Sequence, residues 1–253
     1  NFIYVGAVEV GMMRRKMDYV NPGVYTSLGY RSATVLSSVD GISWSSGFGG
    51  DASGNLSRES LVAQSRQFYR DNGLYAGVIN RPVAYIVGDG FPLQARSGNE
   101  KWNKQAEALW TTYMQKPEVT GTLDGCQFQR MIVREKFVTG DIFGLWTKAP
   151  GDTEARVQLF EAEQCIPYQR GHDNGIIKDK YNKPTGYNLI GYDRNGTQYV
   201  SRTGGTDYSA QHVFHSFTKE RPSSSRGVPL LQSVFPMLHR INDICDAEAI
   251  ARQ

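Results

Sequence analysis

VFHSFTKERPSSSRGVP, residues 213–229, contains the signals that decide how this chain folds. The short apolar run at 213–217 predicts a β-strand. A polar bend over 221–226 follows, and Gly227 then permits a backbone turn that other residues resist. Pro229 suits the first turn of a helix. The stretch therefore predicts a strand, a bend and a helix in that order, although the bend also fits an ordinary connecting loop.

Beyond this stretch, apolar side chains recur at helical spacing and predict one long helix. Pro236 lies inside this stripe, so we expect a kink there. The stripe consists of Leu231, Val234, Phe235, Leu238, Ile241 and Cys245.

Two helices are expected in the first part of the chain. Ser57 is a suitable N-cap for the first helix, which Asn72 and Gly73 end. The second helix runs toward Gly88, where glycines end it. Pro82 is expected near a kink or a boundary of this second helix.

Two further helices precede the strands. The helix over about 99–115 has an aromatic face that we expect to be buried, formed by Trp102, Ala106, Leu109, Trp110 and Tyr113. Asp124 and Gln127 predict a capping box at the start of the next helix. Thr139 and Gly140 end that helix.

Short strands dominate the middle of the chain. They are expected at 142–146, 156–160, 187–192, 197–201 and 213–217, with a hairpin turn at 193–196. Helices thus come first, strands second and a helix last. This order predicts an α+β fold rather than alternating βαβ units.

Residues 1–56 contain little that would fold alone. The stretch 43–54 is rich in glycine and serine, which resist a packed core, so we expect an extended arm. Its short basic cluster, Arg14, Arg15 and Lys16, is a candidate for docking this arm. Residues 47–52 match a dinucleotide-binding pattern, but polar residues precede them instead of a strand, which favours a linker.

Few residues suggest catalysis or metal binding. His212 and His215 point to opposite faces of a strand, and His215 alternates with apolar neighbours, which favours a satisfied core histidine. Glu161 and Glu163 share one expected strand face and are interpreted as surface charge, because a catalytic pair needs a cleft that separates their pKa values. No enzyme, cofactor or metal site is therefore predicted.

The overall composition limits the possible partners. The 253 residues carry 28 Lys and Arg against 25 Asp and Glu, a formal charge of +3. The basic residues are scattered, so strong binding of nucleic acid through phosphates is not expected. No apolar run reaches the roughly 18 residues of a membrane span.

Several short motifs follow one another along the chain in a fixed order. They are residues 65–72, 86–90, Gly140-Asp141-Ile142-Phe143, 175–187, 213–217, Arg221-Pro222, Arg226-Gly227-Val228-Pro229 and Asp246-Ala247-Glu248. In this order they resemble the lambda-type family of bacteriophage portal proteins. Two differences stand out: serines at 223–225 replace the usual Gly-Gln, and the part before residue 57 matches poorly.

The resemblance implies a non-enzymatic subunit of a dodecameric ring at the portal vertex of the virion capsid. Such a ring, assembled in the host cytoplasm, is the channel for double-stranded DNA in packaging, head–tail joining and ejection. Its implied partners are the major capsid protein, the terminase large subunit, and head–tail adaptor or tail proteins; no membrane is involved. A weakly charged wall suits DNA that must slide past it.

The family's order of parts implies an arm at 1–56, a wing at 57–225 and a helix entering the stem at 226–253. We expect a piece of a longer subunit, without the clip, tunnel loop and crown. Candidate subunit-interface or channel residues are Arg221, Arg226, Gly227, Pro229, Trp102 and Trp110. A head–tail adaptor, a baseplate protein or a phage-encoded hydrolase using Glu161 and Glu163 remain alternatives.

Overall fold

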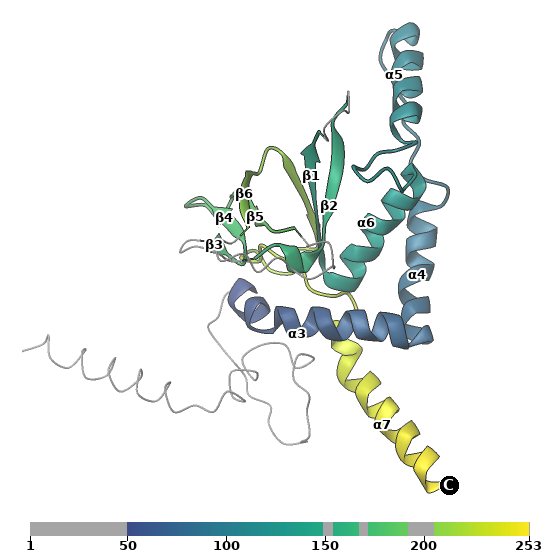
Figure 1. The fold of residues 1–253 in the computed structure, drawn as a ribbon, viewed down its shortest axis with the longest axis vertical. Helices are drawn as coiled ribbons and strands as arrows, with labels where there is room; N and C mark the ends of the chain where they lie inside the picture. The colour runs from purple at the N-terminus through teal and green to yellow at the C-terminus, as the bar shows by residue number, and fades with distance from the viewer. Residues whose placement is uncertain (1–49, 149–153, 167–171, 192–204, 253) are drawn as a thin grey trace, which may run out of the picture.

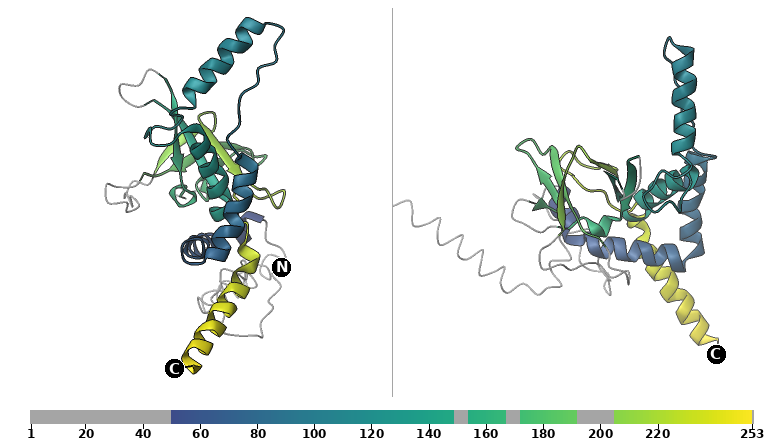
Figure 2. Two further views of the ribbon diagram at one scale, coloured as in Figure 1. Left: turned by 90° about the vertical axis from the view of Figure 1, so that its right-hand side faces the viewer. Right: turned by 45° about the horizontal axis from the view of Figure 1, so that its top comes forward.

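The computed structural model describes residues 50–148, 154–166, 172–191 and 205–252. Its helices are α3 (Gly50–Asp71), α4 (Gly73–Val87), α5 (Glu100–Tyr113), α6 (Gly125–Thr139) and α7 (Phe235–Ala251). Helix α3 crosses the base of the body, with α4 and α6 at one side and the strands above it (Figure 1). Helices α5 and α7 project from the body in different directions (Figures 1 and 2).

The strands form two small antiparallel sheets. The first has the order β2-β1-β7, with strands Arg156–Phe160, Asp141–Thr147 and Val213–Phe217. The second has the order β3-β4-β5-β6, with strands His172–Asp173, Ile176–Lys178, Pro184–Leu189 and Thr206–Ser209. Together with the helices, these sheets confirm the α+β class.

The central strand β1 follows directly from α6. Asp124 caps this helix by accepting a hydrogen bond from the Gln127 amide, and the Gln127 side chain accepts one from the Asp124 amide, so the predicted capping box is confirmed. Gly140 ends the helix with a φ of +91°, a conformation that favours glycine. The chain then enters β1 at Asp141.

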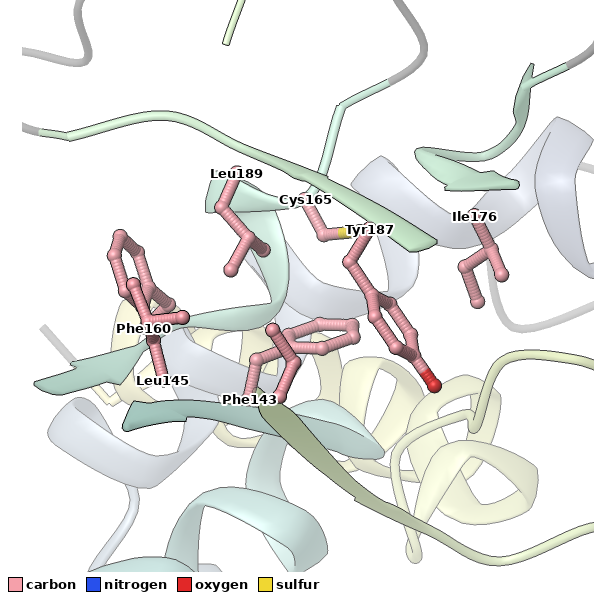
Figure 3. Close-up of a cluster of buried hydrophobic side chains, with 8 residues drawn as sticks. Phe143, Leu145, Phe160, Cys165, Ile176, Tyr187 and Leu189 are labelled. Carbon is pink, nitrogen blue, oxygen red and sulfur yellow. The ribbon is translucent and has the colours of Figure 1, made fainter. Parts of the chain in front are cut away.

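Two apolar cores hold the body together. The helical core consists of Leu61, Phe68, Tyr75, Ile79, Val83, Val138 and Phe235, so α7 joins it through its first residue. The sheet core lies between the two sheets and consists of Phe143, Leu145, Phe160, Cys165, Ile176, Tyr187, Leu189 and Val213 (Figure 3).

The start of the first helix differs from the prediction. Helix α3 begins at Gly50 instead of Ser57, and Ser57 is buried inside it. The expected N-cap is therefore wrong, and residues 50–56 are helical rather than extended. Helical hydrogen bonding prevails here over the low helix propensity of Gly50 and Gly54. The basic cluster of Arg14, Arg15 and Lys16 lies outside the described residues.

Neither proline of the C-terminal segment has the role expected for it. Pro229 lies before a short 3₁₀ helix, η4 (Gln232–Val234), and is not part of α7. Pro236 instead occupies the first turn of α7, where a missing amide hydrogen breaks no helical bond. The predicted kink at Pro236 is therefore wrong.

The other element predictions have mixed outcomes. The strands at 156–160 and 213–217 are confirmed, and β1 is longer than its predicted range. Helix α4 continues through Pro82, so a boundary there is wrong. The predicted strand at 197–201 and the turn at 193–196 lie outside the described residues. No helix among the described residues is long and apolar enough to cross a membrane.

Candidate functional site

Asp141 lies at the centre of a buried polar cluster, which we call the Asp141 centre. Its Oδ2 atom accepts hydrogen bonds from Arg226 Nε at 2.6 Å and from Arg58 at 3.2 Å. Its Oδ1 atom accepts one from the Gly227 amide at 2.6 Å and lies 2.9 Å from His215 Nε2. One carboxylate thereby joins α3, β1, β7 and the bend before α7.

Arg226 extends this cluster toward the second sheet. Its terminal nitrogens donate to the carbonyl oxygens of Ala162 at 2.8 Å, Asn174 at 2.8 Å and Cys165 at 3.3 Å. Its guanidinium also lies over the ring of Phe143, 5.0 Å from the ring centroid. The fixed fork of an arginine suits this role, because several donors point in different directions from one planar group.

The charges of the Asp141 centre are set by burial and by its neighbours. Burial alone would raise the pKa of Asp141, but Arg226, His215 and Arg58 outweigh it and hold this pKa well below its usual value. Burial lowers the pKa of His215, despite the nearby carboxylate, so this side chain is neutral near pH 7. The centre therefore holds one carboxylate and two guanidinium groups.

The side chain of His215 is buried, as the sequence predicts, but its Nδ1 atom has no hydrogen-bond partner among the described residues, so it is only partly satisfied. Its ring stacks between Phe143 and Phe217, with centroids 4.3 and 4.4 Å away. Burial between these rings removes the imidazole from water, and the nearby charges of Arg226 and Arg58 further disfavour its charged form.

Two glycines bring the bend and the start of β1 into backbone contact. A Cβ atom on Gly227 would overlap the carbonyl oxygen of Gly140. A Cβ atom on Gly140 would overlap the backbone of Val228. Pro229, which follows, is fully buried. The bend is therefore a close packing of two backbone segments rather than an ordinary loop.

The chemistry of this centre is structural. Both oxygens of Asp141 are occupied by donors from the chain itself, and its side chain is 0% exposed, so a substrate has no access to it. Burial also raises the pKa of the adjacent Cys165 to about 11, which keeps it a thiol and a poor nucleophile.

A second ionic cluster joins α3 to α6 and to the short helix η3 (Ala162–Gln164). Arg66 lies 2.5 Å from Glu163, 3.1 Å from Glu135 and 3.7 Å from Glu161. The expected shared strand face of Glu161 and Glu163 is therefore wrong, whereas both side chains remain partly exposed, as expected for surface charges. Both carboxylates lie at η3 and share a partly buried guanidinium.

The predicted site residues fall into two groups. Arg226, Gly227 and Pro229 are buried inside the chain and belong to the bend, so they offer no surface to a partner or a channel. Arg221 and Trp102 are exposed and Trp110 is partly exposed. The sequence interpretation missed Asp141 and Arg58 as members of the centre.

Helix α5 does not bury its aromatic face in this chain. No residue of α5 is buried, and Trp102 and Leu109 are among the exposed large apolar residues. At its base, Trp110 and Met114 line an open pocket of about 550 Å³ together with Phe91. Among the described residues the predicted stripe is therefore not buried: Trp102 and Leu109 are exposed, and Ala106, Trp110 and Tyr113 are partly buried.

Helix α7 is also largely uncovered. Phe235 is fully buried, and His239 contacts α3 through Phe68 and Gln64. From residue 240 onward, every side chain that the structure describes in this helix is exposed. Ile241 and Ile244 form part of this uncovered surface.

Comparisons with known proteins address the identity of the chain. No curated protein sequence matches it. Residues 43–253 match the lambda family of phage portal proteins, a span that includes the Asp141 centre and both projecting helices. The chain therefore belongs to the lambda family of phage portal proteins.

Proposed function

We propose that the chain is a subunit of the ring-shaped channel at one capsid vertex through which double-stranded DNA enters and leaves the phage head. The match over residues 43–253 carries this proposal. In this role the described residues form the wing, and α7 leads into the stem. The ring, dodecameric by family resemblance, serves genome packaging, head–tail joining and ejection.

The exposed apolar helices support assembly into a ring. A ring needs two different surfaces on each subunit, because its contacts are head-to-tail. The aromatic face of α5 offers one such surface. A stripe on the outer side of α4 offers another, formed by Leu74, Val78 and Tyr85. We propose that these two faces meet between neighbouring subunits.

Other partners follow from the position of the ring. The major capsid protein would surround it, and the terminase large subunit would dock on it before adaptor or tail proteins replace the motor. DNA would pass without sequence-specific contacts. The formal charge of +3 is compatible with this passage, since each neutralised phosphate adds affinity and slows sliding.

A hydrolase has less support than a structural role. The acidic pair considered for that chemistry, Glu161 and Glu163, is held by Arg66 in ion pairs. A general acid and base need separated pKa values and access to a substrate.

Negative-stain microscopy and mass photometry of the protein test ring formation. We expect rings with a central hole, and a strict monomer at high concentration would contradict the proposal.

A matched pair of tryptophan variants tests the proposed interface. Trp102 on α5 and Trp146 on β1 are 55% and 48% exposed, so their truncation removes similar exposed surface. Trp102→Ala should reduce the fraction of rings, because aromatic anchors dominate interface energies. Trp146→Ala should leave that fraction unchanged. If both variants change the fraction of rings equally, α5 is not part of the interface, but ring formation itself is not contradicted.

A further inference from the structure

A cleft of about 320 Å³ lies where α3, α4 and α6 meet, apart from the Asp141 centre. Its walls are formed by Tyr69 of α3, by Asn80, Val83 and Ala84 of α4, and by Arg130 and Arg134 of α6. The two arginines are four residues apart, so they are neighbours on one face of the helix. The cleft thus places two positive charges side by side.

These charges lack a counter-ion within the described part of the chain. Arg130 donates one hydrogen bond to the Gly88 carbonyl oxygen at 2.6 Å, which fixes its guanidinium but neutralises nothing. Arg134 makes no hydrogen bond or ion pair with any residue that the structure describes. The Nε atoms of both are buried without an acceptor among the same residues. Unsatisfied buried donors and like charges at this spacing both cost stability.

Arg66 shows how the same molecule neutralises another arginine. It forms ion pairs with three carboxylates, those of Glu135, Glu161 and Glu163. The adjacent acidic residue of α6, Glu135, is therefore already paired and is not the partner of Arg134. The contrast indicates that the cleft is suited to an anion from outside these residues.

The opposite wall adds a further donor. The hydroxyl group of Tyr69 donates to Asn80 Oδ1 at 2.8 Å, which orients the amide and leaves its NH₂ group to donate. Guanidinium and amide groups together match an anion with several acceptor oxygens.

We propose that this cleft binds a phosphate group, with Arg130 and Arg134 donating to its oxygens. Two positive charges suit phosphate better than a single carboxylate, because a phosphate monoester carries about −1.5 to −2 at neutral pH. Planar guanidinium groups bind phosphate through paired hydrogen bonds. The phosphate can be free, on a mononucleotide or in the backbone of DNA, where each diester carries a single charge but still offers acceptor oxygens to both guanidinium groups. This proposal does not depend on ring formation.

Binding measurements with the complete chain test the cleft. Isothermal titration calorimetry would use inorganic phosphate and a mononucleotide, and fluorescence anisotropy would use a short DNA duplex. Arg134→Gln should weaken binding about tenfold or more, the loss expected for one charge-assisted hydrogen bond. Arg240→Gln, which removes an exposed arginine from α7, should have little effect. If the duplex is the ligand, Arg134→Gln should also reduce the slope of the logarithm of the binding constant against the logarithm of the salt concentration. The reduction should correspond to about one phosphate contact.

A second variant blocks the cleft while keeping both arginines. Ala84 is exposed on α4 and lines the cleft, so Ala84→Leu should fill it and weaken phosphate binding without unfolding the helix. Thermal melting would verify that each variant is folded. The proposal is overturned if neither phosphate nor duplex binds, if both cleft variants bind like the unmodified chain, or if glutamate binds more tightly than phosphate.

Discussion

The Asp141 centre and helix α5 use polar and apolar side chains in opposite ways. The centre buries charged groups from distant parts of the sequence and satisfies both oxygens of Asp141 inside the chain. Helix α5 exposes aromatic and aliphatic side chains and buries none. The difference separates residues that determine the fold from residues that are available to a partner. Variants in the first region should reduce stability, whereas variants in the second should reduce assembly.

The largest effect is expected from Asp141→Asn. This substitution leaves Arg58 and Arg226 buried without their counter-charge, which should lower the free energy of unfolding by about 3–5 kcal/mol. Urea denaturation followed by circular dichroism measures the loss. Asp243→Asn, at an exposed position of α7, should change it by less than about 0.5 kcal/mol. Similar values for the two variants would mean that the centre does not hold the fold.

A smaller effect is expected from the backbone contact beside this centre. Gly227→Ala places a methyl group against the Gly140 carbonyl oxygen and should destabilise the chain by about 1–3 kcal/mol. Gly77→Ala is its control, because a Cβ atom at Gly77 meets no atom within 4 Å. That control should stabilise α4 by about 0.5–1 kcal/mol. Stabilisation by both substitutions would contradict the close packing of the bend.

The pH dependence of stability tests the buried charges of the Asp141 centre, which helix α5 lacks. Because the folded-state pKa of His215 lies below its ordinary value of 6.5, only the unfolded chain gains this proton just below that pH. Stability should therefore fall on acidification from about pH 6.5, with a slope of at most about 1.4 kcal/mol per pH unit for this one proton. The lowered pKa of Asp141 adds a second decrease below about pH 4.

His215→Gln separates these two steps. Its unfolding free energy, measured by urea denaturation across this pH range, should lose the first decrease and keep the second. An unchanged profile would assign the first step to another group.

The smallest effect on folding is expected from Leu109→Ala on α5. Leu109 is 69% exposed, so its truncation should change the unfolding free energy of the monomer by less than about 0.5 kcal/mol. The same substitution at buried Leu61 should cost about 2–5 kcal/mol. Mass photometry should show fewer rings for Leu109→Ala. A large loss of monomer stability would mean that α5 is packed within its own chain.

Local signals in the sequence predicted much of the secondary structure. The capping box of Asp124 and Gln127 depends only on residues three apart, and it forms as predicted. The strand at 156–160 follows a turn signal and is also confirmed. Pro229 and Pro236 were harder to distinguish, because either residue can occupy the first turn of a helix. The start of α7 coincides with the burial of Phe235 in the helical core, a long-range contact that no local pattern contains.

The Asp141 centre depends on long-range contacts that no local pattern contains. Asp141 is 83 positions from Arg58 and 85 from Arg226, and nothing in their spacing pairs them. An acidic residue directly after Gly140, at the start of an apolar strand, was the available signal. A buried carboxylate needs hydrogen-bond donors or cations around it, but the sequence does not indicate which residues supply them. The exposed face of α5 was missed for a related reason, since helical periodicity indicates an apolar face without saying which molecule covers it.

The attachment of α7 has a mechanical consequence. The helix is held at its root by Phe235, by the contacts of His239 and by the bend at Gly227, whereas within residues 240–251 every side chain that the structure describes is exposed. That free part is about 18 Å long at 1.5 Å per residue, so it acts as a lever. A rotation of about 10° at the root displaces the far end by about 3 Å over this length. A small rotation at the root would thus become a displacement of a few ångströms at the tip, and forces applied at the tip would be carried by the contacts at the root.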